Sequence, residues 1–402
     1  MIADLDQPRA ALRVAAALAL GAAVSLGLAR FSYALLLAPM RADLGWTYLT
    51  AGAMNTVNAG GYLVGALLAS RWLARFDARA VLLAGCAAAA LLLAAHGAVT
   101  GDAALYLLRL LTGVASAATF VSGGLLAARL AGTHPDSAGL MLGIYYGGTG
   151  IGIVASALLL PPLIGLPSAH AWQWGWVALG VAAALSTALM AASTGALAAP
   201  PTRAGARAPF DWRPFGFGLA GYFMFGLGYI GYMTFVITLL REQQLGTTQI
   251  VAFFVLLGAG VVASSWLWAG LLQRCRGGAA LALLNALLAL ATVLPVLSVH
   301  PLAVYASGLL FGSVFLSLVA STTALVRHNL PAALWPGGIS AFTIVFAIGQ
   351  IVGPSAVGWI ADGSGGLQRG LIGSALALAL GAVLAWRQKP LAPARASGSV
   401  PA

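Results

Sequence analysis

Long apolar runs separated by short polar gaps limit most strongly how this chain can fold. Such runs fill most of the 402 residues, and only 7% of the residues are charged. A run of about 20 apolar residues crosses a bilayer as a helix, whereas soluble proteins carry roughly 25% charged residues. We therefore predict an all-α membrane protein with about twelve transmembrane helices and no room for a large soluble domain.

The predicted spans lie at 13–38, 50–70, 79–99, 103–128, 138–162, 172–194, 214–240, 248–271, 278–298, 302–326, 337–361 and 367–387. The longest polar gap is rich in proline and arginine and is interpreted as a linker between two halves. The prediction divides the chain into an N-terminal six-helix half at 1–194, the linker at 195–213, a C-terminal six-helix half at 214–387 and a tail at 388–402.

The distribution of basic residues predicts the orientation in the membrane. An even number of spans puts both termini on one side, where the gaps hold Arg9, Arg13, Arg71, Arg75, Arg79, Arg129, Arg203, Arg207, Arg213, Arg274, Arg276, Arg327, Arg387, Lys389 and Arg395. The opposite side holds Arg41, Arg241 and Arg369. Because Lys and Arg concentrate in cytoplasmic loops, we expect both termini and the linker in the cytoplasm, and the protein in the cell (inner) membrane.

The polar residues do not fit several other classes of function. The net charge of +11 comes from scattered residues rather than from a basic stripe interleaved with aromatic side chains, so nucleic-acid binding is not expected. Cys86 and Cys275 have no nearby partner and the histidines are scattered, so we expect no metal site and no cofactor. A membrane-embedded lipid-modifying enzyme stays a remote alternative, because its chemistry usually needs clustered carboxylates or histidines.

The two halves resemble each other at a shift of about 200 residues. The matching positions are Leu44-Gly45 with Leu245-Gly246, Tyr106 with Tyr305, Gly113 with Gly312, and Gly147 with Gly349. Copies with six spans each have the same topology, so an axis along the membrane normal would relate them, as in transporters with parallel repeats.

Three local patterns add to this repeat. The second and third spans are joined by a loop running from Gly65 to Arg79, with the sequence GALLASRWLARFDAR. The fourth span carries Arg109-x-x-x-Gly113, and the fifth carries Gly143-x-x-x-Gly147-Gly-Thr-Gly150. Together with the six-plus-six repeat, these patterns resemble the major facilitator superfamily (MFS).

The resemblance implies roles for residues of the loop. The superfamily's loop reads G-x-L-A-D-R-x-G-R-R, and this chain matches it with departures at Ala74 and Asp77. The implied gating residues are Gly65, Arg71, Arg75, Asp77 and Arg79. The first span contains Gly27-Leu-Ala-Arg30-Phe-Ser-Tyr33, which resembles the G-x-x-R-F-x-Y string of the YbfB/YjiJ-type branch.

Two arginines lie well inside predicted spans, whereas all nine acidic residues lie in gaps or at span ends. An Arg near the bilayer centre costs about 2.5–3.5 kcal/mol on insertion scales, so Arg30 and Arg109 must face protein or water. Two guanidinium groups without a nearby carboxylate would attract an anion, and the planar fork of Arg suits a carboxylate. Alternatively, Arg109 holds the first and fourth spans together, as the resemblance implies, and Arg30 pairs with an acid at a span end.

Tyrosine and amide side chains supply the other predicted contacts. Tyr33 lies one helical turn from Arg30, and further tyrosines lie in the fifth and seventh spans. The complete set of predicted substrate-binding residues is Arg30, Tyr33, Asn58, Arg109, Tyr145, Tyr146, Tyr229, Tyr232 and Gln350.

The sequence therefore predicts a monomeric secondary transporter in the lipid bilayer that moves a small organic anion, for example a monocarboxylate, by alternating access. Symport, exchange and uniport all stay open. The main alternative is an MFS efflux pump for amphipathic compounds, in which the glycine motif of the fifth span matters more and Arg30 is structural.

Overall fold

The computed structural model describes residues 7–195, 197 and 210–391. Most of the predicted linker at 195–213 and most of the tail at 388–402 therefore lie outside the described residues. Within the described part, the chain is almost entirely helical, as an apolar sequence in lipid requires, because every backbone N–H and C=O must be paired within the protein.

The first span has three parts, α1 (Pro8–Ala22), the π-helix η1 (Ala23–Phe31) and α2 (Tyr33–Leu44). The rest of the N-terminal half consists of α3 (Tyr48–Arg75), α4 (Ala78–His96), α5 (Asp102–Gly132), α6 (Ala138–Leu159), the short α7 (Pro161–Ile164) and α8 (Trp172–Ser193). The C-terminal half consists of α9 (Gly216–Glu242), α10 (Thr247–Leu267), α11 (Ala269–Arg274), α12 (Ala279–Leu297), α13 (Pro301–Asn329), α14 (Trp335–Ala361) and α15 (Gly366–Trp386). Single 3₁₀ turns lie at Pro135–Ser137, Arg213–Phe215 and Ala332–Leu334.

Eleven helical segments of the described chain are long and apolar enough to cross a membrane. The twelfth segment of membrane length is α3, with 28 residues. It is less apolar because Asn55, Thr56 and Asn58 interrupt it, and both asparagines are buried against protein rather than lipid. The predicted all-helical membrane fold is confirmed. The span α3 is less apolar than the others because it carries buried polar side chains.

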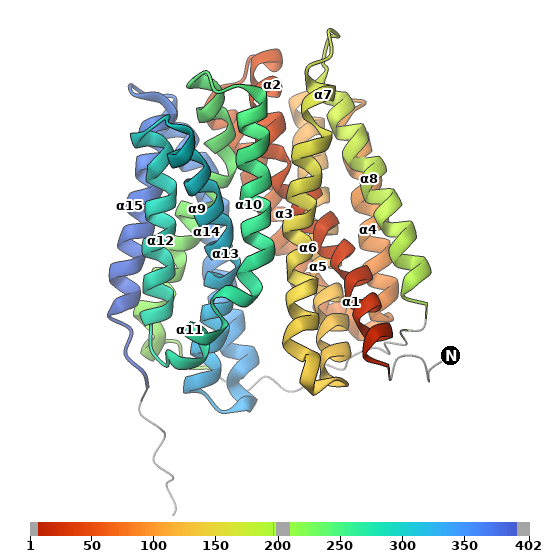
Figure 1. The fold of residues 1–402 in the computed structure, drawn as a ribbon, viewed down its shortest axis with the longest axis vertical. Coiled ribbons are helices and arrows are strands. Elements are labelled where there is room, and N and C mark those ends of the chain that lie inside the picture. Colours follow the sequence, from red (N-terminus) through yellow and green to blue (C-terminus); the bar gives the residue numbers. More distant parts are fainter. Residues whose placement is uncertain (1–6, 196, 198–209, 392–402) are drawn as a thin grey trace, which may run out of the picture.

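The helices form two groups that stand side by side in Figure 1. In the N-terminal half, α5 packs against α3 and α4, and α1 packs against α6. In the C-terminal half, α13 packs against α10 and α12, and α9 packs against α14 and α15. The halves meet through α3 with α14, α6 with α10, and α2 with α9. We call the face at which α1 begins and α15 ends the terminal face, and the opposite one the far face.

Glycine contacts show the internal repeat in three dimensions. A Cβ added at Gly113 would lie 2.1 Å from the carbonyl oxygen of Asn58, so α5 approaches α3 closely. Gly312 has the same role between α13 and α10, with the carbonyl oxygen of Leu257 at 2.0 Å. Small residues allow such close approach of membrane helices.

The predicted pairing of Gly147 with Gly349 is off by one residue. Gly349 brings α14 against α9, with the Phe223 carbonyl oxygen 2.6 Å from an added Cβ. The corresponding close contact of α6 with α1 is made by Gly148, with the Ala19 carbonyl oxygen at 2.0 Å, whereas Gly147 has nothing nearer than 3.7 Å.

Candidate functional site

A cavity of about 720 Å³ lies between the two halves. Its lining comes from the π-helix and from α3, α5 and α6 on one side, and from α9, α10, α11, α13 and α14 on the other. A site that both halves share can be exposed to either side of the membrane when the halves rock about it.

The cavity extends to the terminal face. Residues near the terminal ends of three helices line this part, namely Gly139 of α6, Gln273 of α11, and Arg327 and His328 of α13. Figure 1 shows the lower ends of the two halves, where α1 begins, further apart than their upper ends.

Hydrogen bonds between the halves close the far face. The carboxylate of Asp362, just after α14, accepts from the backbone N–H groups of Tyr48 (2.7 Å) and Leu49 (2.9 Å) at the start of α3. A negative charge at the first turn of a helix is favourable because the N–H groups there have no helical partner. About two turns further along α3, the hydroxyl of Thr56 donates to the carbonyl of Ile351 at 2.7 Å.

The far-face closure also depends on close backbone approach. A Cβ on Gly52 of α3 would lie 2.3 Å from the carbonyl oxygen of Pro354, and a Cβ on Gly358 would lie 2.4 Å from that of Tyr48. Both positions therefore require glycine for α3 and α14 to meet as they do.

The π-helix places Arg30 at the inner end of the cavity. Its nine residues depart from α-helical spacing in the middle of the first span, where Gly27 packs on Gly152 with only 2.5 Å between an added Cβ and the Cα of Gly152. π-helical turns are rare and occur frequently at functional sites. Arg30 lies in the last turn of this segment and is 3% exposed.

The guanidinium group of Arg30 has one hydrogen-bonded partner from the other half. Its Nη2 donates to Oε1 of Gln350, and the same oxygen accepts from the hydroxyl of Tyr229 at 2.9 Å. The guanidinium carbon also lies 5.4 Å from the ring centre of Tyr62 and 5.9 Å from that of Phe31. Its Nε is buried without a hydrogen-bond partner among the described residues. Arg30 thus retains donors for a ligand.

Arg109 has a different environment and does not line the cavity. It is fully buried, and its Nη1 donates to the carbonyl of Ala29 at 2.9 Å, while its Nη2 donates to Oδ1 of Asn55 at 3.2 Å. It also lies over the rings of Tyr33 and Trp176, at 4.9 Å and 5.6 Å. These contacts join the first, second, fourth and sixth spans of the N-terminal half.

The other predicted residues separate into two groups. Tyr146, Tyr229 and Gln350 line the cavity with Arg30. The remaining four are not part of the lining and bond within their own halves: Tyr33 to the Ala51 carbonyl, Asn58 to the Arg109 carbonyl, Tyr145 to the Phe120 carbonyl, and Tyr232 to the Ser307 hydroxyl. The pairs Tyr145/Tyr146 and Tyr229/Tyr232 show that neighbouring tyrosines of one helix can face different surroundings.

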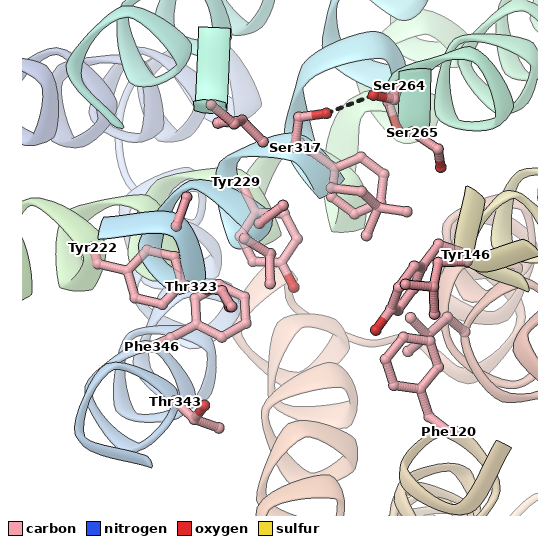
Figure 2. Close-up of a pocket in the computed structure, with 18 of the residues that line it drawn as sticks. Phe120, Tyr146, Tyr222, Tyr229, Ser264, Ser265, Ser317, Thr323, Thr343 and Phe346 are labelled. Carbon is pink, nitrogen blue, oxygen red and sulfur yellow. Dashed lines mark hydrogen bonds between the residues drawn. The ribbon is translucent and has the colours of Figure 1, made fainter. Parts of the chain in front are cut away.

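Aromatic side chains form two facing walls (Figure 2). Phe120 and Tyr146 lie on the N-terminal side, and Tyr222, Tyr229 and Phe346 lie on the C-terminal side. On the latter wall, the rings of Tyr229 and Phe346 lie 5.5 Å apart with 18° between their planes. Sequence reasoning did not assign Phe120 or Phe346, because a Phe in an apolar helix carries no signal that separates a cavity face from a lipid face.

The charge of the cavity has one sign. Arg30 and Arg327 are charged groups of its lining, His328 is ionisable, and no Asp or Glu occurs among the described residues that line it. In a site with little water, a positive group without a fixed counter-charge attracts anions strongly.

The segment predicted as the gating loop is mostly helical: it comprises the end of α3, the two connecting residues 76 and 77, and the start of α4. Gly65 lets α3 approach α5, since an added Cβ would lie 2.5 Å from the Val114 carbonyl oxygen. Asp77 caps α4 by accepting from the N–H of Arg79 at 2.8 Å, and the Arg79 side chain donates to the carbonyl of Ala191 of α8 at 2.8 Å. The other two arginines of this segment, Arg71 and Arg75, lie in the last turns of α3 and are exposed.

Comparison with solved structures shows the same fold at low sequence identity. A bacterial homologue of the human lysosomal transporter Spinster, in an inward-facing and unoccupied conformation, has a TM-score of 0.70 and 14% identity, over 93% of this chain and 96% of that one. The nucleoside transporter NupG has a TM-score of 0.67 and 14% identity, over 94% and 96%. The human organic anion transporter MFSD10 has a TM-score of 0.65 and 17% identity, over 94% and 100%.

At the sequence level, none of the curated proteins matches this chain significantly. The family model described as "Uncharacterised MFS-type transporter YbfB" matches residues 22–386, which is nearly the whole chain. MFS proteins are transporters rather than enzymes, so the alternative of a lipid-modifying enzyme is excluded. The chain therefore belongs to the YbfB-type family of MFS transporters and is an integral membrane protein.

Proposed function

We propose that this transporter moves a small organic anion, with a monocarboxylate carrying an aromatic or apolar body as the best fit. The observation that carries the proposal is Arg30, a buried cation at the inner end of a cavity whose described lining contains no carboxylate. A cation without a resident counter-ion favours a ligand that brings the negative charge itself.

Gln350 offers a way to hold Arg30 while the site is empty. Its amide oxygen accepts from both Arg30 and Tyr229, in the position that one oxygen of a substrate carboxylate would occupy. A carboxylate carries a full negative charge and can accept two parallel hydrogen bonds from the guanidinium, so it would displace the neutral amide. Because Gln350 belongs to the C-terminal half, this exchange would loosen a bond between the halves.

The aromatic walls suit the body of such a substrate. Tyr229 and Phe346 on one side face Tyr146 on the other (Figure 2), and the lining of this cavity also includes Arg30. Aromatic pairs contribute about 0.5–1.5 kcal/mol beyond the area that they bury. A planar ring with one carboxylate would use both the walls and the cation. MFSD10, which has the same fold, is named as an organic anion transporter.

Alternating access would expose this site to each side in turn. The cavity reaches the terminal face, and the bonds of Asp362 and Thr56 close the far face. We place the terminal face in the cytoplasm from the arginine distribution, which makes this an inward-facing state. Exchange, uniport, and symport with a proton carried by the substrate are all compatible with a lining without carboxylates.

A panel of small probes tests the substrate class. Purified protein is titrated with benzoate, hexanoate, benzamide and benzylamine, and binding is followed by calorimetry and by the melting temperature, which rises with any ligand that binds the folded state. We expect benzoate to bind best, hexanoate more weakly, and the neutral amide and the amine at least tenfold more weakly than benzoate. Tighter binding of benzylamine than of benzoate would refute the anion assignment.

The alternative of an efflux pump for amphipathic compounds rests on the glycine motif of α6. Gly150 lies against the other half, with 2.3 Å between an added Cβ and the Gly258 carbonyl oxygen, and an added Cβ on Gly143 would meet the Trp266 ring. Glycines at this contact between α6 and α10 would allow the two helices to slide past each other during import or export. Binding of hydrophobic cations with an affinity independent of Arg30 would favour this alternative.

A further inference from the structure

A second hollow lies on the outside of the N-terminal half and is unrelated to the central cavity. It has a volume of about 700 Å³ and lies between α3 and α4, with α5 as its floor. The groove exists because α3 and α4 both pack along α5 but have little contact with each other. Every residue that lines it is apolar.

The groove faces the surrounding lipid rather than the protein interior. Leu91 at one end is 74% exposed and Phe76 at the other is 56% exposed. Ala84 and Ala88 of α4 and Ala118 of α5 contribute only methyl groups to it, which makes it deep. In a bilayer such a surface must be covered by hydrocarbon.

The length of the groove fits one leaflet. From the start of α4 at Ala78, beside Phe76, to Leu91 the helical rise gives about 20 Å, and half of a bilayer of about 40–45 Å, headgroups included, is about the same. An acyl chain that enters from the terminal face would fill it. A transmembrane helix of a partner would need a groove about twice as long.

The end of the groove at the terminal face is basic. Arg71 and Arg75 lie one turn apart on α3, beside the groove residues Trp72 and Phe76. Both arginines are exposed, and neither side chain has a hydrogen bond or an ion pair with the described residues. The nearby carboxylate of Asp77 accepts from backbone N–H groups at the start of α4.

We propose that the groove between α3 and α4 binds one anionic phospholipid, with its phosphate on Arg71 and Arg75 and one acyl chain along the alanine floor. Guanidinium groups bind phosphate through paired hydrogen bonds, and Trp72 lies where indole rings favour the membrane interface. A zwitterionic lipid has the same chains but brings a positive group close to both arginines, so it binds more weakly. This site contains none of the residues assigned to the substrate.

Lipid adducts of the purified full-length protein test the headgroup contact. Native mass spectrometry follows a titration with phosphatidylglycerol or phosphatidylcholine of identical palmitoyl and oleoyl chains. For the unmodified protein we expect the first phosphatidylglycerol to bind at least tenfold more tightly than the first phosphatidylcholine. The double variant Arg71→Gln/Arg75→Gln should reduce this preference to less than threefold. The matched control Arg274→Gln/Arg276→Gln removes two exposed arginines from the terminal face of the other half and should retain it.

A pair of alanine substitutions on one helix tests the acyl-chain contact. Ala84→Phe fills the groove and should weaken binding of the first phosphatidylglycerol at least tenfold. Ala87→Phe places the same ring on an exposed position of α4 outside the groove and should leave binding within threefold. Both positions are exposed, so both variants should fold, which melting temperature and gel filtration check. Equal affinity for the two lipids in the unmodified protein would overturn the proposal. So would a preference that survives the Arg71/Arg75 variant, or a dimer that Ala84→Phe abolishes.

Discussion

Replacing Arg30 with alanine should weaken substrate binding without destabilising the fold. Arg30 donates to Gln350, but the same amide oxygen also accepts from Tyr229, so the replacement leaves that oxygen with a donor. Removing a buried charge from the membrane interior also lowers the cost of insertion. We therefore expect Arg30→Ala to express normally, with a melting temperature close to that of the unmodified protein.

The size of the binding defect follows from the lost charged hydrogen bond. Such a bond contributes about 1.5–3 kcal/mol, and each 1.4 kcal/mol is a factor of ten, so the Kd for benzoate should rise about tenfold to more than a hundredfold. Arg30→Lys should restore part of the affinity, because an ammonium group keeps the charge but loses the planar fork. Calorimetry on the same preparation as the melting curve gives both quantities.

Arg109→Ala is the matched control, because it also removes an arginine buried inside a span. This change takes the guanidinium donor from the Ala29 carbonyl and from Oδ1 of Asn55, and each buried acceptor without a donor costs about 1–3 kcal/mol. We expect a lower melting temperature and an unchanged affinity per folded molecule. If Arg30→Ala behaves like this control, the anion site is wrong and Arg30 is structural.

Three further changes test the remaining parts of the mechanism. Phe346→Ala should weaken binding of benzoate about threefold to tenfold, with a smaller effect on hexanoate, because the aromatic wall loses a ring pair worth about 0.5–1.5 kcal/mol; calorimetry with both acids measures the difference. Asp362→Ala removes the acceptor for two N–H groups of α3 and should open the far face more often. A cysteine that replaces Thr56 should then react faster with an impermeant maleimide added from the far face. An unchanged rate would argue that these hydrogen bonds do not close the far face. A cysteine at Gly195 in a background without Cys86 and Cys275 should be labelled only from the cytoplasm, and labelling from outside would reverse the orientation.

Hydropathy alone was enough to predict the helices. Each predicted span overlaps one of the twelve continuous helical segments of membrane length, because lipid forces every long apolar run of this chain into a helix. The π-helix at Ala23–Phe31 was not predicted, because an apolar run of this composition can form an α-helix or a π-helix equally well. Its position depends on Gly27 meeting Gly152, which is a contact between distant parts of the chain.

The candidate site was predictable only in part. Arg30 was selected because a charge inside a span is costly and usually has a functional or structural role. The structure places it in the lining of the cavity. The same reasoning selected Arg109, whose donors are instead directed at Ala29 and Asn55 inside one half. Cost alone does not distinguish the two arginines; only the resemblance to the superfamily indicated a helix-joining role for Arg109, and its contacts agree with that role.

The sequence by itself determined that the protein lies in a membrane, how many spans it has and that few charges lie within them, because these properties follow from local composition. Tertiary structure decided which polar groups share a surface. Gln350 and Arg30 are 320 residues apart in the chain, yet they meet when the two halves pack. Tyr145 and Tyr146 are adjacent, yet only Tyr146 lines the cavity. The physical reason is that about 100° of helix rotation separates neighbouring side chains, and packing between helices, rather than local sequence, sets that rotation.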